Sequence, residues 1–458
     1  MAAPRPAGGG AGPGPGAALG AALAAVLAGA GAAEPDSLGD LLAAASRPVG
    51  ISGVRIYLAD IQQVHLYPLA GGTAPPGDAL AIDGTLAGRA YQTGAVQHAP
   101  AGTGAPAGPG DDAGPGDDAG AGDDAGAAVT RPGGAAAPAQ LWVPLLNGAE
   151  RLGALEFTAA DAGPATVARC QALGSLAGLL VASKSDCSDA YARTRRSQPV
   201  ALQAELVHAF TPPPAFGTAD VSVAAILEPA YEVGGDAFDY SLLGDRMQVT
   251  VLDAAGHDLV AGLLASVALA ACRGARRSGG SLADMARHAD RAIVGHFADL
   301  RFATALLCDL NTATGEFTWI PCGHPPPLLI RDGKVIKELA REAWLPLGLG
   351  RFRSAPPGTG RLGGPLPPPC SEQLQRGDRV LLYTDGVTEG RGVDGSQFGL
   401  DRLSDFVIRA TATGLPAPEV LRRLDRVILD FQDGRLSDDA TIVLLDWPPA
   451  GGPQRAAR

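Results

Sequence analysis

Four short segments of the sequence each place an aspartate beside glycine or at the edge of an apolar strand. They are VGGDAFD (233–239), VLDAAGHD (251–258), YTDG (383–386) and SDDAT (437–441). An aspartate at a strand end puts its carboxylate at a sheet edge, and a nearby glycine allows the backbone to approach an ion closely. Carboxylate oxygens are preferred ligands of Mg²⁺ and Mn²⁺, and two such ions that share a carboxylate lower the pKa of a bridging water. Together the four segments predict a two-metal hydrolytic site.

Simpler explanations exist for each of these residues taken singly. Asp–Gly pairs commonly form turns, so one pair alone would carry little weight. His257 and His324 stand in Gly-His turns and could act as general acids, because histidine changes charge near neutral pH. We expect both mainly to anchor loops through hydrogen bonds. Glu389, four residues beyond Asp385, either orients a water or is a solvated loop acid.

A cysteine-based phosphatase is a competing interpretation, because CSDAYAR (187–193) and CSEQLQR (370–376) both have the Cys-x5-Arg spacing. That chemistry needs a tight loop of backbone amides around the phosphate and a strand before the cysteine. The first segment lies in helix-compatible sequence and the second follows three prolines. Neither segment is therefore expected to be catalytic.

The segment from Val221 to Trp447 alternates apolar strands with a few long helices, and it carries all four acidic segments. Strands are predicted at 245–256, 301–311, 317–323, 378–386 and 440–447, and helices at 259–277, 281–297 and 419–431. Ser281 and Asp284 form a capping box at the start of the second helix. Because most strands follow one another as hairpins, antiparallel sheets covered by helices are expected.

Residues 35–183 predict a separate α/β domain. Alternating apolar residues indicate a hairpin around 54–66 and another at 141–157, and a long helix follows with apolar residues from Val167 to Val181. Between the hairpins, the tract at about 100–138 contains three DDAG units among Gly, Pro and Ala, a composition typical of a disordered insertion.

The remaining segments connect or flank these two domains. Residues 1–34 are low in complexity, but Leu19, Leu23, Val26 and Leu27 predict one helical face that contacts a domain. Residues 184–214 predict a helical linker, which the prolines at 212–214 end. Residues 448–458 are expected to be a disordered tail.

Composition excludes several classes of protein. The net charge is −12, which disfavours nucleic-acid binding because that needs a cationic surface. The six cysteines form no CxxC pair, so a zinc ribbon or thioredoxin-type site is not expected. No strongly apolar run reaches the length of a membrane span, and the N-terminus is a poor match to a signal peptide. We therefore expect a cytoplasmic protein that does not contact membranes.

The order and spacing of the four acidic segments resemble the SpoIIE-type serine phosphatases of the metal-dependent PPM superfamily. The resemblance covers residues 200–447 and includes ATALL (303–307), CGHPPPLLIRDG (322–333), PLGL (346–349) and TDGVTE (384–389). The segments GTLAGRAYQTGAVQ (84–97) and VPLLNGAERLGALEF (143–157) resemble a GAF domain. These resemblances imply an α+β fold: a PPM-type αββα sandwich of antiparallel sheets (215–447) preceded by an α/β GAF-like domain (35–183).

The resemblance also implies roles for the acids. Asp253 would bridge two divalent cations, Mn²⁺ or Mg²⁺, and the Ala254 carbonyl would contribute to one of them. Asp385 and Asp438 would hold the other cation and Asp236 would complete the pair, with Asp439 as an alternative to Asp438. Asp253 and Asp385 are thus the expected catalytic residues. Asp258 departs from the family, which generally has glycine there, and could either narrow the mouth of the site or ligate a cation through water.

These observations predict a sensor-regulated protein serine/threonine phosphatase in which a metal-activated water attacks the phosphate directly. The resemblance implies a phosphorylated anti-sigma-factor antagonist as substrate, regulation through the GAF-like domain, and a homodimer formed through that domain and the linker. One alternative is a catalytically weak scaffold whose function is GAF-mediated binding. Another is a two-metal nuclease, which the acidic charge disfavours.

Overall fold

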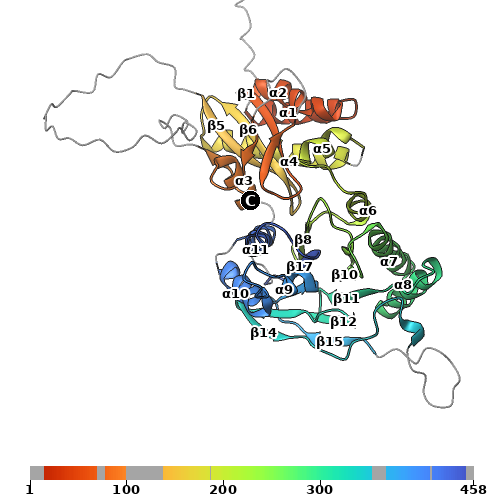
Figure 1. Cartoon of the computed structure of the whole chain (residues 1–458). Coiled ribbons are helices and arrows are strands. Elements are labelled where there is room, and N and C mark those ends of the chain that lie inside the picture. The colour runs from red at the N-terminus through yellow and green to blue at the C-terminus, as the bar shows by residue number, and fades with distance from the viewer. Residues whose placement is uncertain are drawn as a thin grey trace, which may run out of the picture.

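Three antiparallel β-sheets organise the chain, one in an N-terminal domain and two in a C-terminal domain. The computed structural model describes residues 15–69, 78–98, 138–185, 187–352, 368–412 and 415–449. Figure 1 shows the N-terminal domain in red to yellow and the C-terminal domain in green to blue. The expected insertion, apart from Pro138, and most of the expected tail lie outside the described residues.

The N-terminal sheet contains both hairpins that the sequence predicts. Its strands are β1 (Ile51–Ala59), β2 (His65–Pro68), β3 (Leu80–Ala81), β4 (Gln97–His98), β5 (Ala139–Asn147) and β6 (Glu150–Ala159). Their order in the sheet is β3-β2-β1-β6-β5-β4. β1 pairs with β2, and β5 pairs with β6 across a turn in which Gly148 has a φ of 61°, a conformation that favours glycine.

Helices cover both faces of this sheet. They are α1 (Pro15–Ala30), α2 (Leu38–Ser46), α3 (Leu86–Thr93) and α4 (Pro164–Ser185). α1, α2 and α4 share one core with the sheet, and α3 packs in a separate core around Tyr91 and Trp142. The predicted apolar face of α1 is partly wrong: Val26 is buried, but Leu27 is 59% exposed. The buried stripe instead consists of Ala22, Val26 and Ala30, which are spaced four residues apart.

The segment expected to be a helical linker contains two short helices that belong to different domains. α5 (Asp189–Arg195) buries Tyr191, whose hydroxyl donates to the Pro35 carbonyl at 2.9 Å in the N-terminal domain. α6 (Leu202–Phe210) buries Ala204 and Val207 in the C-terminal core. The covalent connection between the domains is therefore the short non-helical segment 196–201.

The first C-terminal sheet carries two of the acidic segments. Its strands are β9 (Asp236–Leu243), β10 (Arg246–Ala254), β11 (Ala303–Asn311), β12 (Glu316–Cys322) and β15 (Cys370–Gln373), in the order β15-β12-β11-β10-β9. α7 (Leu259–Arg277) and α8 (Leu282–His296) pack on its outer face. The capping box predicted for α8 is confirmed, because the side chains of Ser281 and Asp284 each accept the other's backbone N–H.

The second C-terminal sheet carries the other two acidic segments. Its strands are β7 (Ala215–Gly217), β8 (Ser222–Glu228), β13 (Leu328–Arg331), β14 (Lys334–Glu338), β16 (Arg379–Tyr383) and β17 (Ala440–Asp446), in the order β14-β13-β16-β17-β8-β7. α10 (Gly399–Ala412) and α11 (Ala417–Phe431) cover its outer face, and the short α9 (Asp385–Glu389) follows β16.

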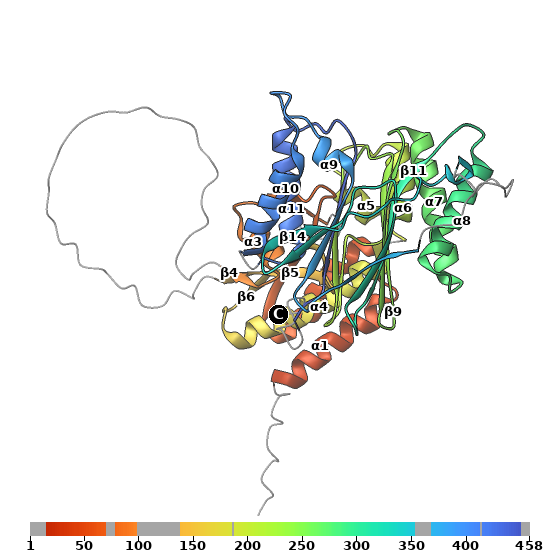
Figure 2. The same ribbon diagram turned by 90° about the horizontal axis from the view of Figure 1, so that it is seen from below.

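The two C-terminal sheets stack face to face between two pairs of helices. Figure 2 shows α10 and α11 on one side, α7 and α8 on the other, and both sheets between them. Val251 of β10 and Val443 of β17 belong to one buried cluster between the sheets. Leu381 and Leu424 belong to the core beneath α10 and α11. This arrangement confirms the expected αββα sandwich.

A network of buried charges joins the two domains. Arg151 of β6 donates to Glu419 of α11 at 2.9 Å, and the two side chains are 5% and 0% exposed. Arg422 of α11 donates to the same Glu419 and also reaches across to Asp83 at 2.7 Å. The Arg151 guanidinium lies 4.5 Å from the centre of the Tyr91 ring. The N-terminal domain therefore contacts the helix that covers the second C-terminal sheet.

Two helices of the described part of the chain, α4 and α7, are long and apolar enough to meet a composition test for a membrane span, with mean hydropathies of 1.4 and 1.5. Each contributes to a domain core, α4 through Cys170 and Leu173 and α7 through Leu264 and Leu269. Core helices commonly meet such a test.

Candidate active site

The acidic segments meet where the two C-terminal sheets face each other. Asp236 begins β9 and lies directly across from Asp253 of β10. Thr384, which follows β16 in the other sheet, donates its hydroxyl to Asp236 Oδ2 at 2.7 Å. Asp385 begins α9 immediately afterwards. One hydrogen bond therefore fixes the first acidic strand of one sheet to the third acidic segment in the other.

Asp439 makes a second connection between the sheets. Its Oδ2 accepts the backbone N–H groups of Gly234 at 2.9 Å, Gly235 at 2.6 Å and Asp236 at 3.3 Å. Asp439 is buried and directly precedes β17. A carboxylate that accepts three backbone hydrogen bonds holds a loop tightly, so Asp439 fixes the loop that carries Asp236.

Two glycines allow this close approach. A Cβ at Gly235 would lie 2.5 Å from the carbonyl oxygens of both Ala254 and Gly256, and one at Gly386 would lie 2.0 Å from the Asp439 carbonyl oxygen. Any side chain at either position would push the acidic loops apart. The glycines beside the acids are thus needed to bring the backbone segments together.

No cationic side chain is among the described groups that shift the pKa values of the carboxylates of this site. Burial, then the charges of Asp385 and Asp438, raises the pKa of Asp253 to about 7. Burial and the charge of Asp253 raise the pKa of Asp236 well above its usual range. Burial raises the pKa of Asp385, and Glu389 and Asp438 add to the effect. The site therefore favours a bound positive charge.

Asp438 and its neighbour Asp439 have different surroundings. The Asp439 side chain is occupied by the three backbone donors, whereas Asp438 is exposed and accepts only the N–H of Asp439, at 2.9 Å, among the contacts of the described residues. The charge of Asp438 nevertheless acts on Asp253 and Asp385. Asp438 thus has the more accessible carboxylate for a ligand role, and Asp439 has the positioning role.

The donor set fits hard divalent cations in an open coordination. The available groups are all oxygens: the carboxylates of Asp236, Asp253, Asp385 and Asp438, with the Ala254 backbone beside Gly235. Among the described residues, no three His, Cys, Asp or Glu side chains form a closed ligand cluster. Mg²⁺ is usually held by one or two carboxylates and keeps several waters, so it does not need a closed cluster.

His324 lies behind Asp253 as a neutral, buried group. Burial lowers the pKa of His324 to about 3. Its Nδ1 is 2.8 Å from the Thr304 hydroxyl, which is itself 3.4 Å from Asp253 Oδ2. A histidine with this pKa is uncharged at neutral pH and lacks the second ring proton, so it positions Thr304 rather than acting as a general acid.

The turn that contains His257 has a different role from the turn that contains His324. His257 is exposed, and its backbone passes against Gly234. The next residue, Asp258, caps α7 by accepting the Ala261 N–H at 2.9 Å. The residue that departs from the family's usual glycine is therefore an N-cap, which stabilises a helix start.

Sequence reasoning missed the two threonines of the site. Thr384 and Thr304 hydrogen-bond to Asp236 and Asp253, and each stands inside a motif already singled out, TDGVTE and ATALL. The sequence signal for Thr384 was the adjacent Asp385, whereas no acid stands beside Thr304 in ATALL. Glu389 is exposed at the end of α9, and its charge acts on Asp385.

The two Cys-x5-Arg segments do not form phosphate-binding loops. Cys187 is exposed just after α4. Cys370 begins the edge strand β15 opposite Trp319, and Arg376 lies over the Trp447 ring at 4.5 Å. Neither cysteine has its arginine beside it in a loop of amides, as the sequence indicated.

The C-terminal domain is similar to known proteins. Residues 244–448 match the family model for Stage II sporulation protein E (SpoIIE). The chain is 22% identical over 228 residues to the phosphoserine phosphatase RsbU of Bacillus subtilis, covering 49% of this chain and 63% of RsbU. It is 24% identical over 249 residues to protein IcfG of Synechocystis, covering 48% of this chain and 37% of IcfG. The chain thus spans less than two thirds of the length of these curated relatives.

Among solved structures, the SiaA-PP2C domain of Pseudomonas aeruginosa is similar, with 23% identity, a TM-score of 0.41, and coverage of 49% of this chain and 85% of that domain. The matched residues lie in the C-terminal domain, so it is this part of the chain that is similar to SpoIIE.

Proposed function

We propose that the chain is a metal-dependent protein phosphatase that hydrolyses phosphoserine or phosphothreonine. The observation that carries the proposal is the set of close carboxylates from both sheets, which raise one another's pKa within a SpoIIE-type domain. The relative RsbU is a phosphoserine phosphatase by name. A phosphorylated anti-sigma-factor antagonist remains our proposed substrate.

In this proposal Asp253 and Asp236 hold one side of a two-cation site, and Asp385 and Asp438 hold the other. The bound cations would supply Lewis acidity for the phosphate and for a nucleophilic water. The chain's own residues position the ligands: Thr384 orients Asp236 and Asp439 fixes the glycine loop. Thr304 hydrogen-bonds to Asp253, and the neutral His324 hydrogen-bonds to Thr304. Rigid positioning of this kind limits the reorganisation that catalysis would otherwise need.

Regulation through the N-terminal domain is supported by contacts between the linker and the loop before Asp236. His208 of α6 hydrogen-bonds the Ala230 carbonyl at 2.7 Å. Ala201 donates its backbone N–H to the Tyr231 carbonyl, and Ser197 donates to the Tyr231 hydroxyl. A displacement of the linker would therefore move the segment that leads to Asp236. We further propose that the N-terminal domain is a GAF-like sensor, that it and the linker mediate dimerisation, and that the protein is cytoplasmic.

An assay of the purified chain tests this function. Hydrolysis of an aryl phosphate and of a phosphoserine protein is measured with Mn²⁺, with Mg²⁺ and with EDTA. We expect turnover with either cation, loss in EDTA, and recovery with excess Mn²⁺, because carboxylate sites bind these cations reversibly. A protein that binds partners but shows no turnover with either cation would instead favour the scaffold alternative.

Asp438 and Asp439 provide a matched pair of variants for deciding which of the two carboxylates coordinates the cation. Asp438→Asn should weaken Mn²⁺ binding, measured by calorimetry, while leaving metal-free stability unchanged, because the side chain is exposed. Asp439→Asn should lower metal-free stability by about 1.5 kcal/mol, because a charged acceptor of three backbone donors is lost. The reverse pattern would assign the ligand role to Asp439.

A further inference from the structure

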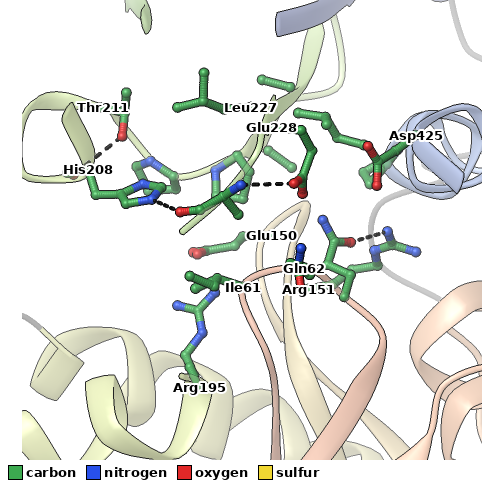
Figure 3. A pocket seen from close by; sticks show the side chains of 18 of the residues that line it. Ile61, Gln62, Glu150, Arg151, Arg195, His208, Thr211, Leu227, Glu228 and Asp425 are labelled. Carbon is green, nitrogen blue, oxygen red and sulfur yellow. Dashed lines mark hydrogen bonds between the residues drawn. The ribbon is translucent and has the colours of Figure 1, made fainter. Parts of the chain in front are cut away.

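A pocket of about 370 Å³ lies between the two domains, away from the acidic site. The N-terminal domain contributes Ile61, Gln62 and Arg151, and the C-terminal domain contributes Glu228 and Asp425, among others. Figure 3 shows Glu228 and Asp425 together at one end of the pocket, with Arg195 and His208 away from them. A cavity of this volume accommodates a small organic molecule.

Asp425 of α11 is a buried carboxyl to which no described side chain or backbone group is hydrogen-bonded. It is 5% exposed and lines the pocket. Within the described part of the chain it makes no hydrogen bond or ion pair. Its neighbour Glu228, at the end of β8, is 4% exposed and accepts the Ala230 N–H at 2.8 Å through one oxygen. Buried acids are normally paired, because an unpaired polar group in the interior costs stability.

The positive groups around the pocket are already engaged. Arg151 donates to Glu419 and to Gln63, and Arg196 donates to both oxygens of Glu205. Arg195 donates its Nε–H to the Ala59 carbonyl at 3.1 Å. Among the described residues, no arginine that lines the pocket forms an ion pair with Asp425 or Glu228, so these two acids leave their end of the pocket open to a cationic group.

We propose that this pocket binds a small organic cation, an alkyl amine or guanidinium, whose charged group is held by Asp425 and Glu228. The apolar side chains of Ile61, Leu227 and Phe238 line the same cavity and would contact the alkyl part of the ligand. Such a ligand would connect the N-terminal domain with α11 and β8 of the C-terminal domain.

The pocket is also connected to the acidic site through one loop. Glu228 fixes Ala230 at the start of this loop, and Asp439 fixes Gly234 and Gly235 at its end, just before Asp236. A cation that draws the Glu228 carboxylate away from the Ala230 N–H would shift this loop. Binding in the pocket therefore has a direct route to the position of Asp236.

The charges that face the two acids come from α11. Burial raises the pKa of Asp425 to about 7, and Arg426 and Arg422 act in the opposite direction. Burial and the charge of Asp425 raise the pKa of Glu228 well above its usual range. The hydrogen bonds that Glu228 accepts from Ala230 and Gln62, and the charge of Arg426, act to lower the same pKa. An arriving cation would ionise both carboxyls, so binding should release protons.

Calorimetric titration of the full chain with agmatine, in EDTA, tests the proposal directly because it does not depend on phosphatase activity. We expect saturable binding that weakens about tenfold or more in Asp425→Asn and in Glu228→Gln, since each removes a charge-assisted contact. The matched control is Asp430→Asn, an exposed acid on the same helix, which should bind agmatine within about twofold of the unchanged chain. Absence of saturable binding, or equal affinity in Asp425→Asn, would overturn the proposal.

Two further measurements keep the test decisive if a pocket variant fails to fold. Titrations of the unchanged chain at pH 7, in buffers with different ionisation enthalpies, should show proton release on binding. No release would contradict capture by the two acids. Asp253→Asn should bind agmatine normally, and loss of binding in that variant would place the cation in the acidic site instead.

Discussion

The Glu419 cluster at the domain interface and the acidic site both bury carboxylates, but only the Glu419 cluster pairs its carboxylate with arginines. At the interface, burial acts to raise the pKa of Glu419, and the hydrogen bond from Arg422 with the charge of Arg151 outweighs it and holds the pKa below its usual range. At the acidic site, burial and neighbouring acids raise the pKa of Asp253 to about 7. The first cluster is complete without any added ion, whereas the second still requires positive charge.

This difference separates a structural charge cluster from a functional one. A buried ion pair that loses one partner becomes costly, so removing an interface arginine should destabilise the fold. Neutralising Asp253 or Asp385 reduces the repulsion among the acids of the site, so it should leave the fold intact and damage only cation binding. Replacing a charged side chain by a neutral one is therefore expected to destabilise the fold at the Glu419 cluster, and to leave the stability of the fold unchanged or raise it at the acidic site.

The largest expected effect is on hydrolysis when an acid of the site is neutralised. Asp253→Asn and Asp385→Asn should each lower metal-dependent turnover by about 1000-fold or more, roughly 4 kcal/mol of transition-state stabilisation, because a ligand charge is lost. Thermal unfolding in EDTA should show both variants as stable as the unchanged chain or more stable. Full turnover in either variant would remove that residue from the metal site.

The next largest effect is on stability at the interface. Arg151→Ala should lower the free energy of unfolding by about 3 kcal/mol, because Glu419 stays buried with a partner removed. Denaturant unfolding measures the change. The control is Arg55→Ala, which removes the exposed ion pair with Glu156 and should cost less than about 1 kcal/mol. Equal losses in both variants would show that the interface network is no more stabilising than a surface pair.

A smaller effect distinguishes the two regions by pH. The pKa of Asp253 is raised in the folded protein, so its contribution to stability is complete below the unfolded pKa, near 4, and is lost as pH rises through about 7. The melting temperature of the metal-free chain should therefore fall between pH 5 and pH 8, by about 3 °C if the loss is roughly 1 kcal/mol. Excess Mn²⁺ should reduce this fall, and the part that remains is expected from Asp425 and Glu228, whose pKa values are also raised. A pH dependence that Mn²⁺ does not change would place the responsible groups elsewhere.

The smallest effect is expected at the cysteines. Cys187→Ser and Cys370→Ser should both retain full turnover, because neither thiol lies near the acidic site and the proposed nucleophile is water. Steady-state kinetics with Mn²⁺ checks this. An activity that resists EDTA and disappears with either cysteine would replace the metal mechanism with a thiol mechanism.

The sequence determined much of the C-terminal domain because its signals are local. Apolar strand-like segments predicted β10 and β11, a capping box predicted the start of α8, and Asp beside Gly predicted the acidic turns. α10, β8 and the β13–β14 hairpin were not among the predicted elements. The face of α1 was only partly predicted, because the choice between Leu27 and Ala30 depends on where the helix lies against its neighbours.

The sequence by itself determined that four acidic turns exist, and the carboxylate side chains in these turns favoured divalent cations as ligands of the site. Only the tertiary structure decided how they are used. Asp438 and Asp439 are adjacent and chemically identical, and they differ because the Gly234–Gly235 loop, some 200 residues away in sequence, reaches only Asp439. Glu419 and Asp425 lie on one helix, yet one meets Arg151 and the other faces a pocket. The fate of a buried charge depends on partners that are distant in sequence, and folding alone brings those partners together.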